Sequence, residues 1–296
     1  MNYQHGFHAG GFSDVLKHAT LANLMAALSA KDKPYLIIDT HGGRGGYDLG
    51  DQGSVTMEWK MGIGRLLPMR QPPPALVDYI RVVRAYDKKF GNFNIKPAEG
   101  VRHYPGSPRI ARALLRPDDR LVVAELNPRE AIFLKREFAG DKGIDVREED
   151  GYGLLKSMLP PPERRALVLI DPPYESRDET ENAVAAIDHG LRRFATGVYA
   201  LWYPIKDMKF VQALHEAVIA LDPPETIAVH VQMMRMNPMP RMLVGSGMIV
   251  INPPWKFADT MRELAPWLAA NIGGNRGATA EVKTLVPEKG ARPPEG

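Results

Sequence analysis

The chain has no cysteine among its 296 residues. Disulfides and thiolate-bound metals are therefore excluded, and any metal site would need His, Asp or Glu ligands. No apolar run approaches the roughly 18 residues that a membrane span requires. The first residues also lack the basic start and apolar stretch of a signal peptide. We expect a cytoplasmic protein without membrane contact.

Two nucleotide-binding signatures are also missing. The glycine-rich loop at 40–46, Thr-His-Gly-Gly-Arg-Gly-Gly, does not fit the G-x-G-x-x-G fingerprint, because Asp48 occupies the sixth position counted from Gly43. The chain also has no P-loop lysine in this loop. Nicotinamide cofactors and nucleoside triphosphates are therefore disfavoured. The net charge of +3 permits a polyanionic partner without requiring one, because acidic and basic residues are interspersed.

The pattern that is present alternates helical periodicity with short apolar runs. This alternation is typical of buried parallel strands joined by helices, and 44% apolar residues suffice for a large core. A first helix is predicted from Ser13 to Ala30, beginning on a Ser-Asp cap. Because ligands bind at the carboxyl ends of such strands, the chemistry is expected there. Seven strands are predicted, at 35–39, 120–126, 144–148, 166–171, 197–203, 225–232 and 247–252.

About 80 residues separate the first two predicted strands, far more than a normal crossover contains. Apolar residues recur at helical spacing between 76 and 86, and the prolines at 72–74 mark a helix start. The sequence therefore predicts a core of residues 1–46 and 105–287 with an inserted helical subdomain at 47–104. The polar, Pro- and Gly-rich residues 288–296 are predicted to be disordered.

Acidic residues close three successive predicted strands. Asp39 precedes the glycine-rich loop, Glu125 ends the second strand, and Asp150 stands beside Gly151. Adenosylmethionine carries an ammonium, a sulfonium, two hydroxyls and an amino group, which all suit carboxylate partners. The alternative is a glycine-rich turn without a ligand, with the acids acting as helix caps.

The apolar run 166–170 ends in Asp171-Pro172-Pro173-Tyr174. An aromatic amine such as adenine N6 is a poor nucleophile, because its lone pair is delocalised into the ring. The Asp171 carboxylate and the Pro172 carbonyl can accept its two hydrogens and direct the lone pair toward a methyl group. Tyr174 would stack on the flipped-out base. The alternative is a strand end with Asp171 as a turn residue.

A second copy of this pattern, Asn252-Pro253-Pro254-Trp255, follows the apolar run 248–251. Order along the chain favours Asp171 as the reaction centre, because it ends the fourth strand after the glycine-rich loop and the strand-end acids. Asn252 ends the last long apolar run. We expect the second copy to terminate a strand and to carry a structural aromatic residue.

Several segments together resemble the bacterial 23S ribosomal RNA (adenine(2030)-N6)-methyltransferases, in the order in which that family has them. The resemblance covers about residues 1 to 287 and includes the Asn252 segment at 246–255. The segments are His-Gly-Phe-His-Ala-Gly at 5–10, Asp-Val-Leu-Lys-His at 14–18, Asp-Thr-His-Gly-Gly at 39–43, Tyr-Pro-Gly-Ser-Pro at 104–108, Ile-Asp-Pro-Pro-Tyr-Glu at 170–175 and Trp-Tyr-Pro at 202–204.

The resemblance implies a Rossmann-like class I methyltransferase core, a seven-stranded, mostly parallel α/β sheet with the helical insertion. It also implies adenosylmethionine as methyl donor, no metal, and protein-free or early-assembly 23S ribosomal RNA as partner of a monomeric enzyme. Asp171 would be the catalytic acceptor, while Tyr3, His5 and Lys17 would face the RNA. The cofactor residues would be His18, His41, Ser107, Glu125, Asp150, Gly151 and Asp171.

Other interpretations stay open at this point. A DNA adenine-N6 methyltransferase would use the same four residues. A catalytically inactive adenosylmethionine-binding or RNA-assembly protein would keep its function after loss of Asp171. A protein glutamine methyltransferase would share an Asn-Pro-Pro-Tyr motif. Ser107 could be only a helix N-cap. Eight basic residues could follow RNA phosphates or simply be solvated: Arg81, Arg84, Lys88, Lys89, Arg109, Arg112, Arg116 and Arg120.

Overall fold

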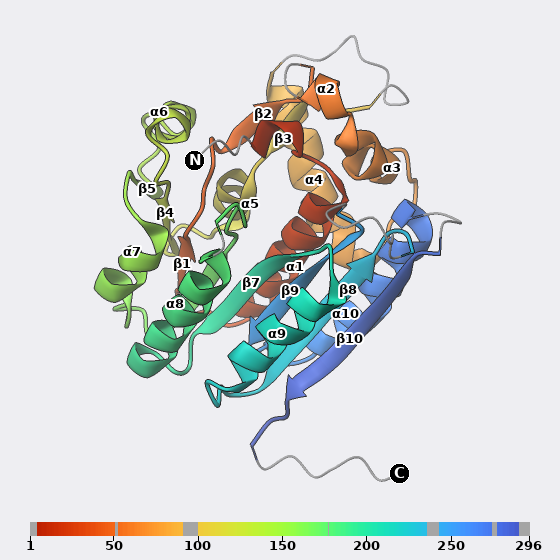
Figure 1. Cartoon of the computed structure of the whole chain (residues 1–296). Helices are drawn as coiled ribbons and strands as arrows, with labels where there is room; N and C mark the ends of the chain where they lie inside the picture. The colour runs from red at the N-terminus through yellow and green to blue at the C-terminus, as the bar shows by residue number, and fades with distance from the viewer. Residues whose placement is uncertain are drawn as a thin grey trace.

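A computed structural model describes residues 5–50, 53–90, 100–176, 178–235, 243–273 and 277–289. Its centre is an eight-stranded sheet in the order β10-β8-β9-β7-β6-β1-β4-β5 (Figure 1). The strands are β1 (Leu36–Asp39), β4 (Arg120–Ala124), β5 (Ile144–Arg147), β6 (Ala166–Ile170), β7 (Val198–Ile205), β8 (Thr226–Gln232), β9 (Gly245–Ile251) and β10 (Thr279–Val286).

The five strands β5, β4, β1, β6 and β7 are parallel. Strand β9 runs antiparallel between β7 and β8, and β10 is antiparallel to β8. Because β1 has β4 on one side and β6 on the other, the chain order reverses at β1. The carboxyl ends of β1, β4 and β6 therefore flank a topological switch point, where doubly wound sheets bind ligands.

All seven predicted strands are present, and the mostly parallel α/β sheet is confirmed. The predicted count of seven is wrong, because β10 adds an eighth strand at the edge. Glu281 and Lys283 interrupt its apolar residues, and its side chains are half-buried or exposed. An edge strand buries less surface than a central one, so β10 lacks the continuous apolar run that marks a central strand such as β6.

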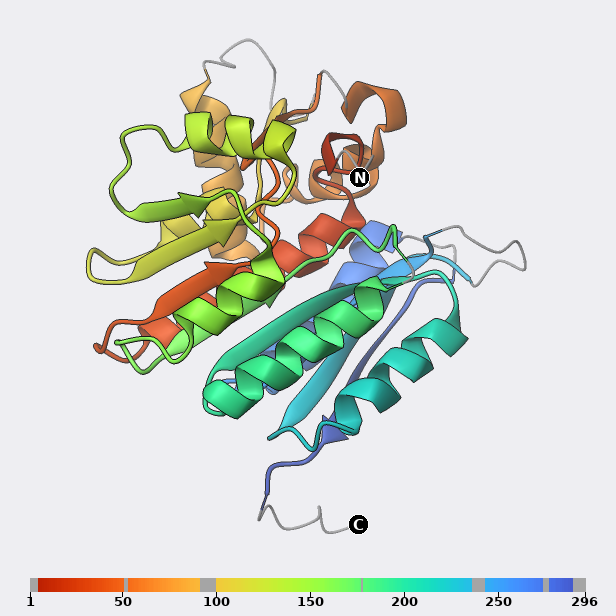
Figure 2. The same ribbon diagram turned by 60° about the vertical axis from the view of Figure 1, so that its left-hand side comes forward.

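Helices cover both faces of the sheet (Figures 1 and 2). Leu36 and Ile38 of β1 point into one buried cluster, whereas Ile37 points into the other, as strand alternation requires. Three helices pack on the Ile37 face: α1 (Phe12–Ser29), α5 (Ser107–Leu114) and α10 (Phe257–Leu268). The opposite face is covered by α7 (Gly151–Met158), α8 (Glu179–Arg193) and α9 (Met208–Ile219). Helix α6 (Pro128–Glu137) follows β4, and a π-helical turn, Ala269–Gly273, follows α10.

The predicted insertion, 47–104, begins in β2 (Gly46–Asp48) and ends in β3 (His103–Pro105), which pair as a two-stranded antiparallel sheet. Its longest helix, α4 (Pro74–Lys89), starts with Pro74 at its first turn, as the proline run predicted. Tyr79 and Val83 of α4 are buried in the cluster that α1 shares. The shorter elements are η1 (His5–Phe7) before α1, and α2 (Gly53–Thr56), η2 (Glu58–Met61) and α3 (Ile63–Leu66) within the insertion.

Helix α1 starts differently from the prediction. Its N-cap is Gly11, which has no capping side chain, and Ser13 lies inside the helix. Asp14 Oδ2 accepts the backbone N–H of Gly10 at 2.9 Å. The predicted Ser-Asp cap is therefore wrong, because Asp14 points back toward the residues that precede the helix.

The separability of 47–104 as a subdomain stays a prediction. The predicted disordered tail, 288–296, lies outside the described residues from residue 290 onward. In the described parts of the chain, every helix is too short or too polar to cross a membrane.

Candidate active site

A cleft opens at the carboxyl ends of β1, β4 and β6, beside the start of α1. Its empty volume is about 800 Å³, part of which is open solvent. Most of the residues predicted for the site contribute to its wall. The lining residues are His5, Ser13, Asp14, Lys17, His18, His41, Gly42, Gly43, Tyr47, Gly106, Ser107, Glu125, Asn127, Glu130, Asp171, Pro172, Pro173 and Trp202.

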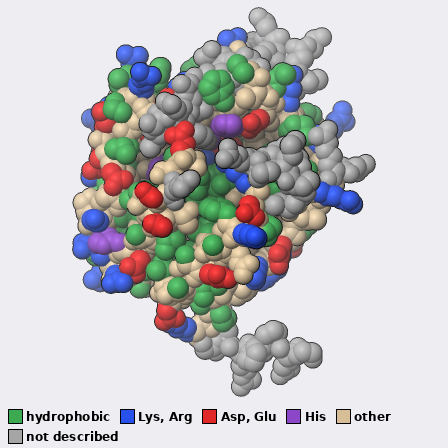
Figure 3. Space-filling model, in the orientation of Figure 1, with side chains coloured by type: hydrophobic (Ala, Val, Ile, Leu, Met, Phe, Trp, Pro, Cys, Tyr) green, Lys and Arg blue, Asp and Glu red, His purple; other side chains and the backbone are tan. Residues whose placement is uncertain are grey.

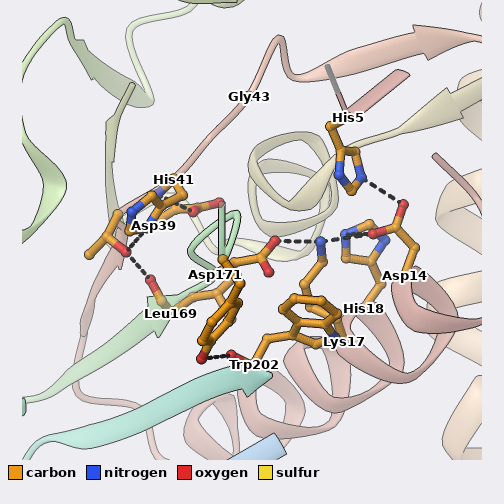
Figure 4. A network of polar contacts seen from close by, with 12 residues as sticks. His5, Asp14, Lys17, His18, Asp39, His41, Gly43, Leu169, Asp171 and Trp202 are labelled. Atoms are coloured by element: carbon orange, nitrogen blue, oxygen red, sulfur yellow. Dashed lines mark hydrogen bonds and ion pairs between the residues drawn. The ribbon is translucent and has the colours of Figure 1, made fainter. Parts of the chain in front are cut away.

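Lys17 joins two carboxylates at the floor of this cleft (Figure 4). Its Nζ lies 2.5 Å from Asp171 Oδ2 and 2.8 Å from Asp14 Oδ1. Lys17 and Asp14 come from α1, one helical turn apart, whereas Asp171 directly follows β6. The Lys17 side chain is 5% exposed and that of Asp14 is 1% exposed, so these charges interact with little solvent screening.

Burial and charge act in opposite directions on these groups. Burial disfavours the Lys17 ammonium, but the carboxylates of Asp14 and Asp171 hold its pKa well above the usual value. Burial likewise opposes ionisation of Asp14, but the charges of His5 and Lys17 hold its pKa well below the usual value. Lys17 is therefore a cation and Asp14 an anion at neutral pH.

Asp14 also contacts the segment that precedes α1. Its Oδ2 lies 3.0 Å from Nε2 of His5 and accepts the Gly10 N–H. The four side chains His5, Asp14, Lys17 and Asp171 consequently form one polar chain from η1 to the end of β6 (Figure 4).

His18, a buried residue of α1, lies beside the polar chain of His5, Asp14, Lys17 and Asp171. Its Nδ1 is 2.7 Å from the Tyr104 hydroxyl, which in turn is 2.8 Å from the Tyr79 hydroxyl. Burial lowers the pKa of His18 to about 3, so the imidazole is neutral. Its Nε2 has no hydrogen-bond partner among the described residues and belongs to a side chain that lines the cleft.

His41 stands in the glycine-rich loop with a defined tautomer. Thr40 Oγ1 donates to the Leu169 carbonyl at 3.0 Å, so it must accept from His41 Nδ1 at 2.7 Å (Figure 4). Burial lowers the pKa of His41 to about 4, which leaves the ring neutral. Nε2 of His41 is therefore a hydrogen-bond acceptor.

Asp39 and Ser107 lie together at the end of β1. Burial raises the pKa of Asp39 to about 6, while a hydrogen bond from Ser107 opposes this shift. Asp39 Oδ2 is buried without a hydrogen-bond partner in the described structure. The N-cap of α5 is Gly106, so the expectation that Ser107 caps this helix is wrong: Ser107 is the first helical residue and lines the cleft instead.

Glu125, just beyond β4, is held by two backbone amides. Its Oε2 accepts from Gly43 N–H at 2.8 Å and its Oε1 from Asn127 N–H at 2.7 Å. Burial raises the pKa of Glu125. The loop 40–46 is thereby tied to the end of β4, and the carboxylate faces the cleft.

Asp150 and Gly151 play backbone roles at the start of α7. Asp150 caps this helix, accepting from the N–H groups of Tyr152 at 3.2 Å and Gly153 at 2.9 Å. A Cβ on Gly151 would lie 1.9 Å from the carbonyl oxygen of Thr40, so glycine lets α7 approach the loop. Neither residue is among those found lining the cleft.

Pro172 lines the cleft beside Asp171, but Tyr174 does not. The Tyr174 hydroxyl donates to the Trp202 carbonyl at 2.9 Å, and its ring lies 5.9 Å from the Trp202 ring and 5.8 Å from the Phe210 ring, centroid to centroid. Trp202 contributes to the cleft wall. The stacking role of Tyr174 stays a prediction, and Tyr3 lies outside the described residues.

The second proline motif lies at the end of the sheet opposite to the cleft, where the parallel strands begin. Strand β9 runs antiparallel to β7, with Ile251 opposite Tyr199 at the start of β7, whereas Ile170 of β6 pairs with Leu201. The Asn252 side chain donates to the carbonyls of Ala195 and Gly197, each at 2.7 Å. Asn252 thus terminates a strand, away from the cleft, but the expectation of a structural aromatic residue is wrong, because Trp255 is 84% exposed.

Most of the eight basic residues considered as phosphate contacts are paired with acids. Arg109 contacts Glu137, Arg112 contacts Asp141, Arg116 contacts Asp119, Arg120 contacts Glu163 and Arg81 contacts Asp78. On the face shown in Figure 3, acidic and basic side chains are interspersed. These observations favour a structural and solvated role for the paired arginines.

Comparison with known proteins decides which family has this site. A family model described as "Ribosomal RNA large subunit methyltransferase D, RlmJ" matches residues 32–285. The chain belongs to the RlmJ family. The ribosomal RNA large subunit methyltransferase J of Escherichia coli is 38% identical to it over 289 residues, covering 97% of this chain and 100% of the relative. The enzyme of the same name from Haemophilus influenzae is 37% identical, covering 97% and 95%.

A solved structure supports the fold assignment. A Legionella pneumophila protein superposes with a TM-score of 0.83 at 33% identity, covering 94% of this chain and 98% of that one. Membership of the RlmJ family confirms the predicted methyltransferase activity and, with the sheet order, the predicted class I methyltransferase fold.

The cleft of this RlmJ-family protein fits a methyl donor of the adenosylmethionine type. The buried Asp39 Oδ2 and His18 Nε2 both lack partners in the described structure. Glycines line the loop side, and Asp14, Glu125, Glu130 and Asp171 outnumber the single lysine among the lining residues. Carboxylates and neutral imidazoles suit a ligand that carries a sulfonium, an ammonium and hydroxyls. Among the described residues, no group of three or more His, Asp or Glu is placed to hold a metal.

Sequence reasoning assigned no role in the site to two residues that organise it. Asp14 stands three and four positions before Lys17 and His18, a helical spacing that could have indicated the contact. Tyr104 reaches His18 across 86 residues of sequence, and no local pattern signals such a pair.

Proposed function

We propose that this protein transfers a methyl group from adenosylmethionine to N6 of an adenine of 23S ribosomal RNA, adenine 2030, with the base flipped into the cleft at Asp171-Pro172-Pro173-Tyr174. The observation that carries the proposal is the position of Asp171 at the carboxyl end of β6, in the same cleft as Glu125, Ser107 and His41, which are proposed to bind the methyl donor. The names of the relatives support ribosomal RNA of the large subunit as substrate.

Asp171 would accept one hydrogen of the adenine amine. Lys17 occupies its Oδ2, so Oδ1 is the oxygen that can receive the N–H. The Pro172 carbonyl, held by two consecutive prolines, would accept the second hydrogen, and the nitrogen lone pair would then point away from both acceptors. The negative charge of Asp171 would stabilise the positive charge that develops on this nitrogen.

The transfer balances in atoms and charge. A carbon–nitrogen bond forms to N6 while the carbon–sulfur bond of the donor breaks, and one proton leaves the amine for solvent. When bound, the donor supplies an electrophilic methyl group. Tyr174 would contribute its ring as a stacking surface for the base.

The residues proposed to hold the donor are His18, His41, Ser107, Glu125, Asp150, Gly151 and Asp171. The neutral His18 and the acceptor Nε2 of His41 would receive donor N–H or O–H groups, and Glu125 would accept hydroxyls. Asp150 and Gly151 would contribute by fixing the backbone at the start of α7, where Asp150 caps the helix and Gly151 allows its close approach to the loop.

Tyr3, His5 and Lys17 are proposed to face the RNA. His5 and Lys17 both line the cleft, on η1 and α1. We propose protein-free or early-assembly 23S RNA as the substrate of a monomeric, cytoplasmic enzyme.

A labelling experiment tests this function. Labelled adenosylmethionine is offered with unmodified 23S RNA, assembled large subunits or adenine-containing duplex DNA, using the wild type and Asp171→Ala. We expect label in free 23S RNA, little in assembled subunits and none with Asp171→Ala, while Asp188→Ala on α8 labels like the wild type. Label in DNA alone would indicate a DNA adenine methyltransferase, and label that survives Asp171→Ala would exclude Asp171 as the catalytic acceptor.

A further inference from the structure

We propose that Asp14 is a positioning residue for the methyl transfer: it holds the Lys17 ammonium against Asp171 and adds a second carboxylate near the reacting amine. The inference rests on the proposed function, because it concerns how Asp171 performs that reaction. Asp14 touches neither the reacting amine nor the donor in this scheme, and acts through Lys17.

The geometry gives Asp14 a complete set of partners. Its Oδ1 lies 2.8 Å from Lys17 Nζ, and its Oδ2 contacts His5 Nε2 at 3.0 Å and the Gly10 N–H at 2.9 Å. The residue is 1% exposed. A buried carboxylate with three donors has a fixed orientation, so it fixes the position of the lysine that it binds.

The arrangement leaves one oxygen of Asp171 free for chemistry. Lys17 Nζ is 2.5 Å from Asp171 Oδ2, which directs Oδ1 of that carboxylate toward an incoming amine. Without Asp14, the Lys17 ammonium would lose its ion pair with Asp14 Oδ1. It could then shift toward either oxygen of Asp171 and compete with the substrate N–H groups.

Charge balance gives Asp14 a second effect. Asp14 adds a second carboxylate to the ammonium and carboxylate of the Lys17–Asp171 pair. The amine that attacks the methyl group becomes positive, and a negative site stabilises that charge. Removal of the Asp14 charge would leave a neutral Lys17–Asp171 pair and a weaker field at the amine.

Asp14 also links the site to η1. Through His5 it contacts the 3-10 turn that precedes α1, and His5 and Lys17 are the two described residues proposed to face RNA. One buried carboxylate therefore contacts both side chains, and its effect on the catalytic acceptor passes through Lys17.

The experiment compares wild type, Asp14→Asn, Lys17→Met and the double variant, in single-turnover methylation of 23S RNA and in binding of adenosylmethionine. For Asp14→Asn we expect turnover to fall about 10- to 100-fold, the effect of a misplaced reacting group. Donor affinity should change less than about threefold. In the Lys17→Met background, Asp14→Asn should change turnover by less than about threefold, because Asp14 acts only through Lys17.

A pH profile separates positioning from a purely structural role. With Asp14→Asn, Lys17 loses one of its two carboxylates while staying buried, so its pKa should drop and the alkaline loss of turnover should begin at a lower pH than in the wild type. A structural defect would lower turnover at every pH alike. The charged and titratable groups that face Lys17 are Asp14 and His18 on α1, His5 on η1, Asp39 on β1, Tyr79 on α4 and Asp171 after β6.

Asp188→Asn is the matched control, because it removes one carboxylate of an exposed pair with Arg192 on α8, and wild-type turnover is expected. Wild-type turnover in Asp14→Asn, or fully additive losses in the double variant, would overturn the inference. An inactive wild type would instead refute the proposed function itself. If Asp14→Asn does not fold, Asp14→Glu and Asp14→Gln differ only in charge, and equal turnover of these two variants would overturn the inference.

Discussion

Asn252 offers a sharp test of the difference between the two proline motifs. Its side-chain amide donates to the carbonyls of Ala195 and Gly197, and its backbone φ of 54° lies in the left-handed region. Asparagine tolerates this conformation better than alanine does. The substitution Asn252→Ala therefore removes two hydrogen bonds and adds backbone strain, without touching the cleft.

The magnitude follows from these contacts. Two hydrogen bonds contribute about 0.5–1.5 kcal/mol each, and a left-handed alanine costs roughly 1 kcal/mol. Asn252→Ala should lower the free energy of unfolding by about 2–4 kcal/mol. For a chain of this length that corresponds to a fall in Tm of roughly 3–6 °C.

The assay combines thermal unfolding with methylation of 23S RNA at a temperature at which the variant stays folded. We expect the Tm to fall and turnover to stay within about twofold of wild type. Asn271→Ala is the control, since it removes one exposed hydrogen bond to Trp267 and should cost less than about 1 kcal/mol. An unchanged Tm, or lost turnover in a stable Asn252→Ala, would refute the structural assignment of the second motif.

Three further predictions concern the cleft. His18 and His41 have folded-state pKa values of about 3 and 4, below the unfolded value of about 6.5, so the stability that they contribute is complete above pH 6.5 and lost as pH falls toward those values. Each histidine should lower the free energy of unfolding, measured in urea, by about 2 kcal/mol at pH 5 relative to pH 7. Asp39 has a raised pKa of about 6, so it raises the free energy of unfolding by about 1 kcal/mol at pH 5 relative to pH 7 and offsets part of this loss. Gly151→Ala should lower the free energy of unfolding by about 2 kcal/mol or more and weaken donor binding measured by calorimetry, because its Cβ would meet a backbone carbonyl oxygen at 1.9 Å. Tyr174→Phe should cost about 1 kcal/mol in urea unfolding and leave turnover within about threefold, because it loses one hydrogen bond and keeps its ring.

Each of these predictions has an outcome that contradicts it. Equal stability at pH 5 and pH 7 would mean that the two histidines are not buried as neutral rings. Wild-type donor affinity in Gly151→Ala would show that α7 need not approach the loop so closely. For Tyr174, loss of turnover in the phenylalanine variant would assign chemistry to the hydroxyl, and Tyr174→Ala serves as the variant that removes the ring.

The sheet was largely predictable because its central strands are buried on both faces. Runs such as 166–170 have no polar residue to pair with solvent, and such runs mark parallel strands. Strand β10 was not predicted, because Glu281 and Lys283 interrupt its apolar residues at an exposed edge of the sheet. Its place depends on pairing with β8, a long-range contact that its own residues do not signal.

The candidate site was predictable where strand ends carry its residues. Asp171 and Glu125 follow apolar runs directly, and parallel strands bring their carboxyl ends to one edge. Asp14 and Tyr104 were not predictable in this way. Their roles depend on where α1 and β3 pack, and tertiary packing decides that.

The identity and position of the methylated nucleoside test the central claim most directly. Unmodified 23S RNA is incubated with adenosylmethionine and wild type or Asp171→Ala, digested, and analysed by mass spectrometry with mapping of the modified nucleotide. We predict N6-methyladenosine at position 2030 with the wild type and none with Asp171→Ala. A methyl group on another atom or base, or equal methylation by the variant, would contradict the proposed site and its chemistry.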